Sequence, residues 1–391
     1  MSLKYGISVA TLFLLAIAMA KASGGAKVSG SAKSGAQPND SVRMNEIQVI
    51  GTHNSYHAGL APSEAQLLAK TDPVESRALE YKHPSLTAQL EAANRELELD
   101  VYPDPQGGRY AASRGLQDVV AAGLPPDDPH YYPDGLMQQP GFKVMHKPDT
   151  DYRSICQPFV ECLRQIHAWS AANPQHMPLF LFIETKIPTT LKTTDLDALD
   201  AEVRSVFAPS EMVTPDDVRG KHASLLEAVH KDGWPTLAQS RGKVVFLMAR
   251  EEVVDIYKVG HPRLEGRVMF VNGKIGDPDT VFTVQSKNKH NLIQQLVADG
   301  MLVLTRCDAD MVEARINDTQ RRDSAFDSGA QLLSTDYPAS EPAIWSGYTV
   351  QFPHGEVARC NPVLRPKNCI SSELEPILSA QKITTAISAS K

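Results

Sequence analysis

Side chains that transfer protons or bind cations follow four apolar runs of this sequence. His53 and Asn54 come directly after the run that begins at Ile47, and His146 ends the run that begins at Lys143. The other two runs carry carboxylates and a lysine, at Glu96, Glu98, Asp100, Glu184 and Lys186. Carboxylate and amide oxygens suit calcium or magnesium and not zinc. Two imidazoles beside such a cation suit acid–base catalysis on a phosphodiester.

The run ELELDVYPD alternates acidic and apolar residues. Its acids are Glu96, Glu98 and Asp100, a spacing that puts three side chains on one face of a strand. In an antiparallel sheet, such a face is usually exposed to water. If the apolar face packs beneath helices instead, the acids point into a barrel, where buried carboxylates need a cation or close partners. Glu184 and Lys186 have the same two-residue spacing and therefore share a face.

Short apolar runs of strand character alternate with longer helical patterns along most of the chain. The expected strands are Glu46–Ile50, Glu96–Asp100, Lys143–His146, Leu179–Glu184, Val244–Met248, Val268–Val271, Leu302–Thr305 and Gln331–Ser334. The clearest helical stretches are Phe159–Ala172, Ala198–Phe207, Lys289–Ala298 and Met311–Ser328. This alternation predicts an α/β fold, a parallel (β/α)8 barrel of the TIM type, whose active site lies at the C-terminal ends of the strands. Arg306 and Asp336 follow the last two strands, where one could hold a phosphate and the other orient a histidine, or both could form structural salt bridges.

Two segments do not fit the alternation. Residues 103–142, after the second strand, contain seven Pro and six Gly together with Tyr110, Tyr131 and Tyr132. This long loop is either a lid over the barrel mouth or a passive insertion. Residues 339–391 lack a helix–strand pattern, and we expect a C-terminal extension that wraps a barrel formed by residues 43–338.

The N-terminus has the pattern of a targeting segment. Lys4 precedes an apolar run over residues 5–20, and small residues follow at possible cleavage sites, which predicts a signal peptide over residues 1–22. The alternative is a retained membrane anchor, although the run is short for a full span. Residues 23–42 are rich in Gly, Ser, Ala and Lys and are expected to form a flexible linker. We therefore expect an exported protein, secreted or periplasmic, without a transmembrane span in its mature form.

Charge and cysteine content narrow the possible functions. The net charge is −7, so no basic surface for nucleic acid is expected. Export permits disulfides, and the short spacings predict the bridges Cys156–Cys162 and Cys360–Cys369, with Cys307 left as a buried thiol. The sequence has no Gly-x-Ser-x-Gly or His-Glu-x-x-His pattern, so it lacks the motifs of serine hydrolases and zincins.

Several motifs together resemble one known family. GTHNSY at residues 51–56, ELD at 98–100, the strand-terminal His146 and IETK at 183–186 resemble the catalytic domain of phosphoinositide-specific phospholipase C. The likeness is greatest to the secreted, calcium-dependent bacterial branch, and it extends over roughly residues 44–362 through HKPDTDYRSICQPFVECLRQI, WPTLAQSRGKVVFL and NDTQRRDSAFDSGAQLLSTDYP. The resemblance implies that His53 and His146 form the catalytic pair and that Lys186 helps to neutralise the phosphate. It also implies a Ca²⁺ cofactor, coordinated by Asn54, Glu98, Asp100 and Glu184.

The resemblance implies a phosphodiesterase that cleaves phosphatidylinositol, at a membrane or micelle surface, into diacylglycerol and inositol phosphate. The nucleophile would be the neighbouring inositol hydroxyl, and we expect a monomer. The Glu-x-Lys pattern is shared with glycerophosphodiester phosphodiesterases, so the alternative is an enzyme acting on soluble deacylated phospholipids. A third hypothesis is a non-catalytic barrel that binds sugars or lipids. The presence of the complete set of expected catalytic and metal-ligating residues argues against it.

Overall fold

The computed structural model describes residues 39–127, 135–186, 191–285 and 289–375. The expected signal peptide, most of the expected linker, Tyr131 and Tyr132 lie outside these residues. No helix in the described part of the chain has the length and apolar character needed to cross a bilayer.

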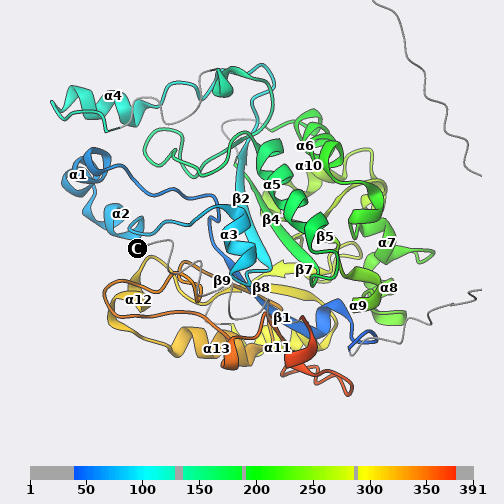
Figure 1. The fold of residues 1–391 in the computed structure, drawn as a ribbon. Coiled ribbons are helices and arrows are strands. Elements are labelled where there is room, and N and C mark those ends of the chain that lie inside the picture. The colour runs from blue at the N-terminus through cyan, green and yellow to red at the C-terminus, as the bar shows by residue number, and fades with distance from the viewer. Residues whose placement is uncertain (1–38, 128–134, 187–190, 286–288, 376–391) are drawn as a thin grey trace, which may run out of the picture. The chain divides into compact units, whose positions relative to one another are not determined.

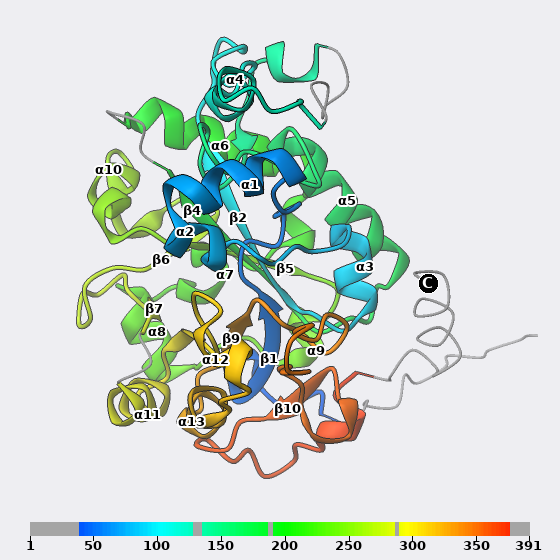
Figure 2. The same ribbon diagram turned by 90° about the vertical axis from the view of Figure 1, so that its left-hand side faces the viewer.

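Eight parallel strands form a nearly closed barrel in the order β6-β5-β4-β2-β1-β9-β8-β7 (Figures 1 and 2). They are β1 (Ile47–Thr52), β2 (Glu96–Tyr102), β4 (Leu179–Thr185), β5 (Val244–Met248), β6 (Met269–Val271), β7 (Phe282–Val284), β8 (Leu302–Arg306) and β9 (Leu332–Thr335). A single parallel bridge between Asn272 and Phe282 joins the two end strands. The prediction of a TIM-type α/β barrel is confirmed.

Helices cover the outside of the barrel, and several short ones lie in the connections at its mouth (Figure 1). The helices are α1 (Pro62–Thr71), α2 (Pro73–Ala78), α3 (Leu86–Glu91), α4 (Arg114–Ala121), α5 (Phe159–Ala172), α6 (Thr193–Val206), α7 (Pro215–Arg219), α8 (Leu225–Lys231), α9 (Leu237–Ser240), α10 (Val254–Lys258), α11 (His290–Ala298), α12 (Val312–Ile316) and α13 (Gln320–Ser328). The long helices are amphipathic, with one apolar face that packs against the barrel. For example, α5 buries Phe159, Leu163 and Ile166. The helices thus shield the outer faces of the strands from water.

The structure corrects the expected third strand. The sequence predicts a barrel strand over Lys143–His146, but β3 covers only Lys143–Val144 and pairs antiparallel with β2. The strand that completes the barrel is β7, which the sequence prediction missed because Thr283 interrupts its apolar run, whereas the equally short β6 lies in the unbroken run Val268–Val271. The expected helix Met311–Ser328 is in fact two helices, since Asn317 adopts a left-handed conformation (φ 55°) and ends α12.

Both predicted disulfides, Cys156–Cys162 and Cys360–Cys369, are present, and Cys307 is a buried free cysteine. The second bridge joins β10 (Ala358–Cys360) to the chain that follows it. β10 pairs antiparallel with the first half of β1, at the end of the barrel opposite the mouth.

The acids of β2 point into the barrel, as predicted. Glu96, Glu98 and Asp100 are all at most 4% exposed, and the intervening residues of β2 pack outward in the apolar core. Glu96 lies in register with Gly51 of β1. A Cβ atom at position 51 would lie 2.1 Å from Oε2 of Glu96, so only glycine leaves room for this side chain. Glu98 and Asp100 occupy successively higher levels toward the mouth.

Candidate active site

The turn after β1 is fixed to β2 by one serine. Ser55 Oγ accepts a hydrogen bond from the Glu98 amide at 2.8 Å, and the Ser55 amide donates to the Glu98 carbonyl at 3.0 Å. Asn54 adopts φ 47°, a left-handed conformation that asparagine tolerates better than most residues. This tight turn holds His53 and Asn54 at the mouth, beside the acidic strand.

Three of the predicted metal ligands come together at the mouth. Glu98, Asp100 and Glu184 each offer a carboxylate oxygen, and these oxygens lie within 4.8 Å of one another. Burial raises the pKa of Asp100 to about 6 although Lys186 opposes the shift, and burial together with the Asp100 charge raises the pKa of Glu98 well above its usual range. Asp100 Oδ1 is buried and accepts no hydrogen bond from any described residue. Converging buried oxygens with an unsatisfied lone pair suit a hard divalent cation such as Ca²⁺.

Lys186 lies within this carboxylate cluster. Its Nζ is 2.8 Å from Asp100 Oδ2 and 3.0 Å from Glu184 Oε1, and Arg250 Nη1 is 3.1 Å from the same Glu184 oxygen. The ammonium group therefore neutralises part of the negative charge here.

Asn54, the fourth predicted ligand, is oriented by two tyrosines. Its Nδ2 donates to the Tyr81 hydroxyl at 2.8 Å, and its Oδ1 accepts from the Tyr56 hydroxyl at 3.0 Å. Burial and the nearby charge of Asp100 raise the pKa of Tyr56 well above its usual range, so this hydroxyl stays protonated beside the cluster.

His53 is held by a buried aspartate. Its Nδ1 is 2.8 Å from Asp336 Oδ1, and Arg306 Nη2 is 2.9 Å from the other oxygen of the same carboxylate. Burial, followed by the charge of Arg306, lowers the pKa of His53 to about 4, although 26% of its side chain remains exposed. The imidazole is therefore neutral near pH 7 and able to accept a proton at Nε2. Arg306, expected as a possible phosphate ligand, is engaged with Asp336 here.

His146 is held in the same way by a different aspartate. Its Nδ1 is 2.9 Å from Asp151 Oδ2, and its backbone carbonyl accepts a hydrogen bond from the Tyr102 hydroxyl. The amide of Met145 donates to the Asp100 carbonyl at 3.2 Å, which places His146 beside the acidic strand although it lies beyond the short β3. Both histidines thus present Nε2 to the mouth.

Several residues of this site were not predicted. Asp151, His57, Tyr81 and His83 all contact the predicted residues or their partners: His83 Nε2, for example, is 3.0 Å from the His53 carbonyl. Asp151 follows His146 by five residues in HKPDTDY, which is the only signal in the sequence that points to it.

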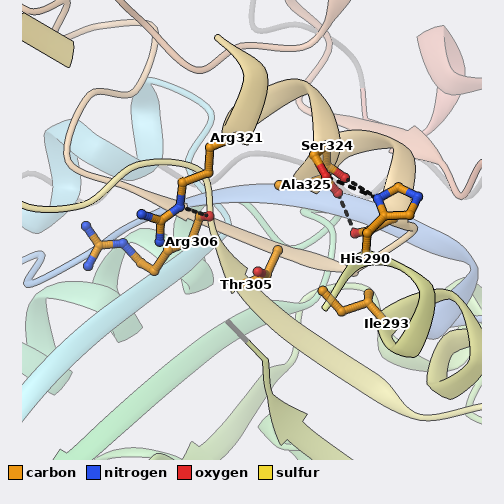
Figure 3. Close-up of a pocket in the computed structure, with 8 residues that line it drawn as sticks. His290, Ile293, Thr305, Arg306, Arg321, Ser324 and Ala325 are labelled. Carbon is orange, nitrogen blue, oxygen red and sulfur yellow. Dashed lines mark hydrogen bonds between the residues drawn. The ribbon is translucent and has the colours of Figure 1, made fainter. Parts of the chain in front are cut away.

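A small cavity lies outside the barrel, between β8, α11 and α13 (Figure 3). Arg321 Nε donates to the Arg306 carbonyl at 3.1 Å on one side of it, and His290 Nδ1 lies 3.1 Å from the Ser324 carbonyl on the other. Its volume of about 10 Å³ is enough for a single water molecule.

Residues 42–362 match the family model described as phosphoinositide phospholipase C, Ca²⁺-dependent. The chain belongs to this family of enzymes. Its members are phosphodiesterases that cleave phosphatidylinositol and depend on Ca²⁺, in agreement with the carboxylate cluster at the mouth. A comparison of the sequence with curated proteins finds no match.

Solved structures of bacterial phospholipases C are similar to this chain, among them two calcium-dependent enzymes. A calcium-dependent phosphoinositol-specific phospholipase C from Pseudomonas sp., in a myoinositol complex, is 15% identical with a TM-score of 0.52, and the alignment covers 82% of this chain and 96% of that one. A Ca²⁺-dependent phosphatidylinositol-specific phospholipase C from Streptomyces antibioticus is 17% identical with a TM-score of 0.49, over 75% of this chain and 94% of that one. At these identities, the similarity to the Pseudomonas structure supports the barrel fold alone.

Proposed function

We propose that this protein is an exported, calcium-dependent phospholipase C that cleaves the glycerol–phosphate bond of phosphatidylinositol, giving diacylglycerol and inositol phosphate. One observation carries the proposal: two histidines, each paired through Nδ1 with a buried aspartate, flank a cluster of three carboxylates. This is the set of groups that an attack by the neighbouring inositol hydroxyl requires.

His53 acts as the general base and His146 as the general acid. His53 Nε2 takes the proton of the inositol hydroxyl as that oxygen forms a bond to phosphorus. The bond from phosphorus to the glycerol oxygen breaks, and His146 delivers a proton to this oxygen. Asp336 and Asp151 keep each ring in the required orientation and stabilise its charged form.

Asn54, Glu98, Asp100 and Glu184 would hold the calcium ion. Bound there, the cation supplies positive charge that stabilises the developing negative charge on the phosphate and lowers the pKa of the attacking hydroxyl. Lys186 adds a further positive charge beside the same oxygens. Arg306 contributes chiefly by fixing Asp336.

Exposed apolar residues beside the mouth favour a lipid substrate over a soluble one. On α12, Val312 and Ile316 are 60% and 73% exposed, and in the segment after β9, Ile344 is 88% exposed. The two segments touch, since Arg315 of α12 lies 4.2 Å from the ring of Trp345. Both leave the C-terminal ends of barrel strands, and Figures 1 and 2 show α12 at the same end of the barrel as α1 and α2. An exposed apolar surface can insert into the interior of a lipid layer, whereas a water-soluble substrate would not require it.

The decisive experiment compares two substrates with and without a calcium chelator. The purified protein should turn over phosphatidylinositol vesicles in the presence of calcium and lose this activity in excess chelator. Rapid turnover of glycerophosphoinositol with little action on vesicles would replace the proposal by a glycerophosphodiesterase. Export is tested separately, by locating the protein in its own cells and sequencing the N-terminus of the mature form.

A further inference from the structure

We propose that His57 is a positioning residue for the general acid, acting on His146 through the carboxylate of Asp151. This inference rests on the proposed function, because it assigns His57 to the proton-donating half of that reaction. His57 does not reach the mouth: it is fully buried.

Asp151 bridges the two imidazoles. Its Oδ1 lies 2.9 Å from Nε2 of His57, and its Oδ2 lies 2.9 Å from Nδ1 of His146. The carboxylate and His57 are both fully buried, whereas the His146 side chain is 21% exposed at the mouth. One oxygen of the carboxylate thus contacts the proposed general acid, and the other contacts a histidine that substrate cannot reach.

The backbone around Asp151 is also fixed. Its amide and carbonyl form a two-way bridge with Lys147, at 3.0 and 2.9 Å. On the other side, the segment after His57 and the segment after Asp151 are joined by a bridge between His57 and Ser154. With the backbone fixed, the Asp151 carboxylate can still rotate about its side-chain bonds. The hydrogen bond from His57 prevents this rotation.

The His57 side chain has no other hydrogen bond in the described part of the chain. Its Nδ1 is buried without a hydrogen-bond partner, so the contact with Asp151 is the one hydrogen bond that its side chain makes. Its ring packs against Tyr81 at a centroid distance of 4.4 Å. Burial of an imidazole with an unsatisfied nitrogen is unfavourable compared with an apolar side chain of similar size, which indicates a use for the nitrogen that is satisfied.

Loss of His57 should therefore act through the orientation of His146. Without the donor at Oδ1, the ionised Asp151 carboxylate has an unmet hydrogen bond in a buried place. It rotates or admits water, and in either case the Nδ1–H of His146 loses its fixed partner. The Nε2 proton of His146 is then less often aimed at the leaving oxygen.

The test uses two inositol phosphodiesters that differ in the leaving group. One carries an alkyl alcohol, as in the lipid, which needs a proton on departure; the other carries p-nitrophenol, which scarcely needs one. For His57→Leu, we expect kcat to fall about 10- to 100-fold with the alkyl substrate, a part of the 10²–10⁴ that general acid catalysis contributes. With the p-nitrophenyl substrate, kcat should change less than about threefold, and KM should stay unchanged for both.

His57→Gln and Asp151→Asn keep the test valid if His57→Leu folds poorly. The glutamine amide can donate to Asp151 from a place close to that of Nε2, so His57→Gln should recover most of the alkyl-substrate activity. Asp151→Asn should show the same selective loss as His57→Leu. His176, a histidine that is 2% exposed and lies 2.7 Å from Ser170 Oγ before β4, is the matched control: His176→Leu should not discriminate between the two substrates.

Equal slowing of both substrates by His57→Leu, or full activity of that variant with the alkyl substrate, would overturn the proposal. Both results are distinct from failure of the proposed function itself, in which the unaltered protein would cleave neither inositol phosphodiester.

Discussion

Replacement of Asp336 by asparagine should disturb the orientation of His53 and leave the rest of the site unchanged. Asp336 is buried, and its two oxygens lie 2.8 Å from His53 Nδ1 and 2.9 Å from Arg306 Nη2. The asparagine side chain would keep the volume of the aspartate but lose the charge that fixes the imidazole. The hydrogen bond between His53 and Asp336 strengthens as His53 takes up the substrate proton, because both partners are then charged.

The size of the effect follows from that bond. A hydrogen bond to a charged group contributes roughly 1.5–3 kcal/mol, which corresponds to a factor of roughly 10 to 150 in rate. Burial and the charge of Arg306 already lower the pKa of His53, and in the variant the charge of Arg306 would no longer be balanced by Asp336. Because this weakens the base further, we expect the upper part of the range, a loss of about 100-fold in kcat.

The assay is calcium-dependent cleavage of phosphatidylinositol vesicles at saturating substrate, with thermal unfolding and calcium binding measured alongside. Asp308→Asn provides the matched control. Asp308 is equally buried and accepts a hydrogen bond from the Asp336 amide at 2.9 Å, but its carboxylate is 3.6 Å from Arg306 and does not contact His53. Asp308→Asn should cost less than about fivefold in kcat. If it slows the enzyme as much as Asp336→Asn, or if Asp336→Asn stays within about threefold of the unaltered protein, the orienting role of Asp336 is refuted.

Four other outcomes are expected. Glu98→Gln should raise the calcium concentration needed for activity at least about tenfold, as removal of one charged ligand from an open site does, with the barrel still folded by circular dichroism. His146→Ala should slow cleavage by about 10²–10⁴ with an alkyl leaving group and much less with a phenolate, and equal losses would contradict its role as the acid. Ile344→Ser should weaken binding to phospholipid vesicles severalfold without altering turnover of a soluble inositol phosphodiester, whereas Ile370→Ser, 49% exposed at the opposite end of the barrel, should change neither. The pKa of Asp100 is raised to about 6, so its contribution to stability is complete below about pH 4 and is lost as the pH rises through 6; added calcium should therefore raise the melting temperature more at about pH 7.5 than at about pH 5.

The repeating features of the sequence predicted the barrel and its acidic strand well. Alternation in ELELDVY placed Glu98 and Asp100 inside, and runs such as Val244–Met248 matched their strands residue for residue. β7 was missed because Thr283 breaks its apolar run, and its parallel pairing with β8 is a long-range contact that no local pattern reports. The single expected helix over residues 311–328 failed at Asn317, where a left-handed residue ends α12 without any proline or glycine to announce it.

The partners of the two histidines were harder to predict than the histidines. Asp336 was named as a possible orienting residue because it follows a strand, and it does contact His53. Asp151 lies in a loop held by contacts with the segment after β1, 94 residues from His57 in the chain, and no local pattern reports such a contact. The bridge from His57 to Asp151 is a property of tertiary packing, so it becomes visible only when the two segments are placed together.

In the proposed mechanism, the unequal surroundings of the two aspartates account for one residue type serving as both base and acid. Asp336 is shared between His53 and Arg306. Burial, followed by the fixed positive charge of Arg306, lowers the pKa of His53 and keeps the imidazole neutral and ready to accept a proton. Asp151 is shared between His146 and another imidazole, so neither oxygen contacts a permanent cation in the described structure. No permanent cation therefore competes with His146 for the negative charge of Asp151, in contrast to the arrangement at Asp336. We infer that the surroundings of the two histidine–aspartate pairs, and not the imidazoles themselves, set the direction of proton transfer. In this direction, His53 accepts the proton of the inositol hydroxyl and His146 donates one to the glycerol oxygen.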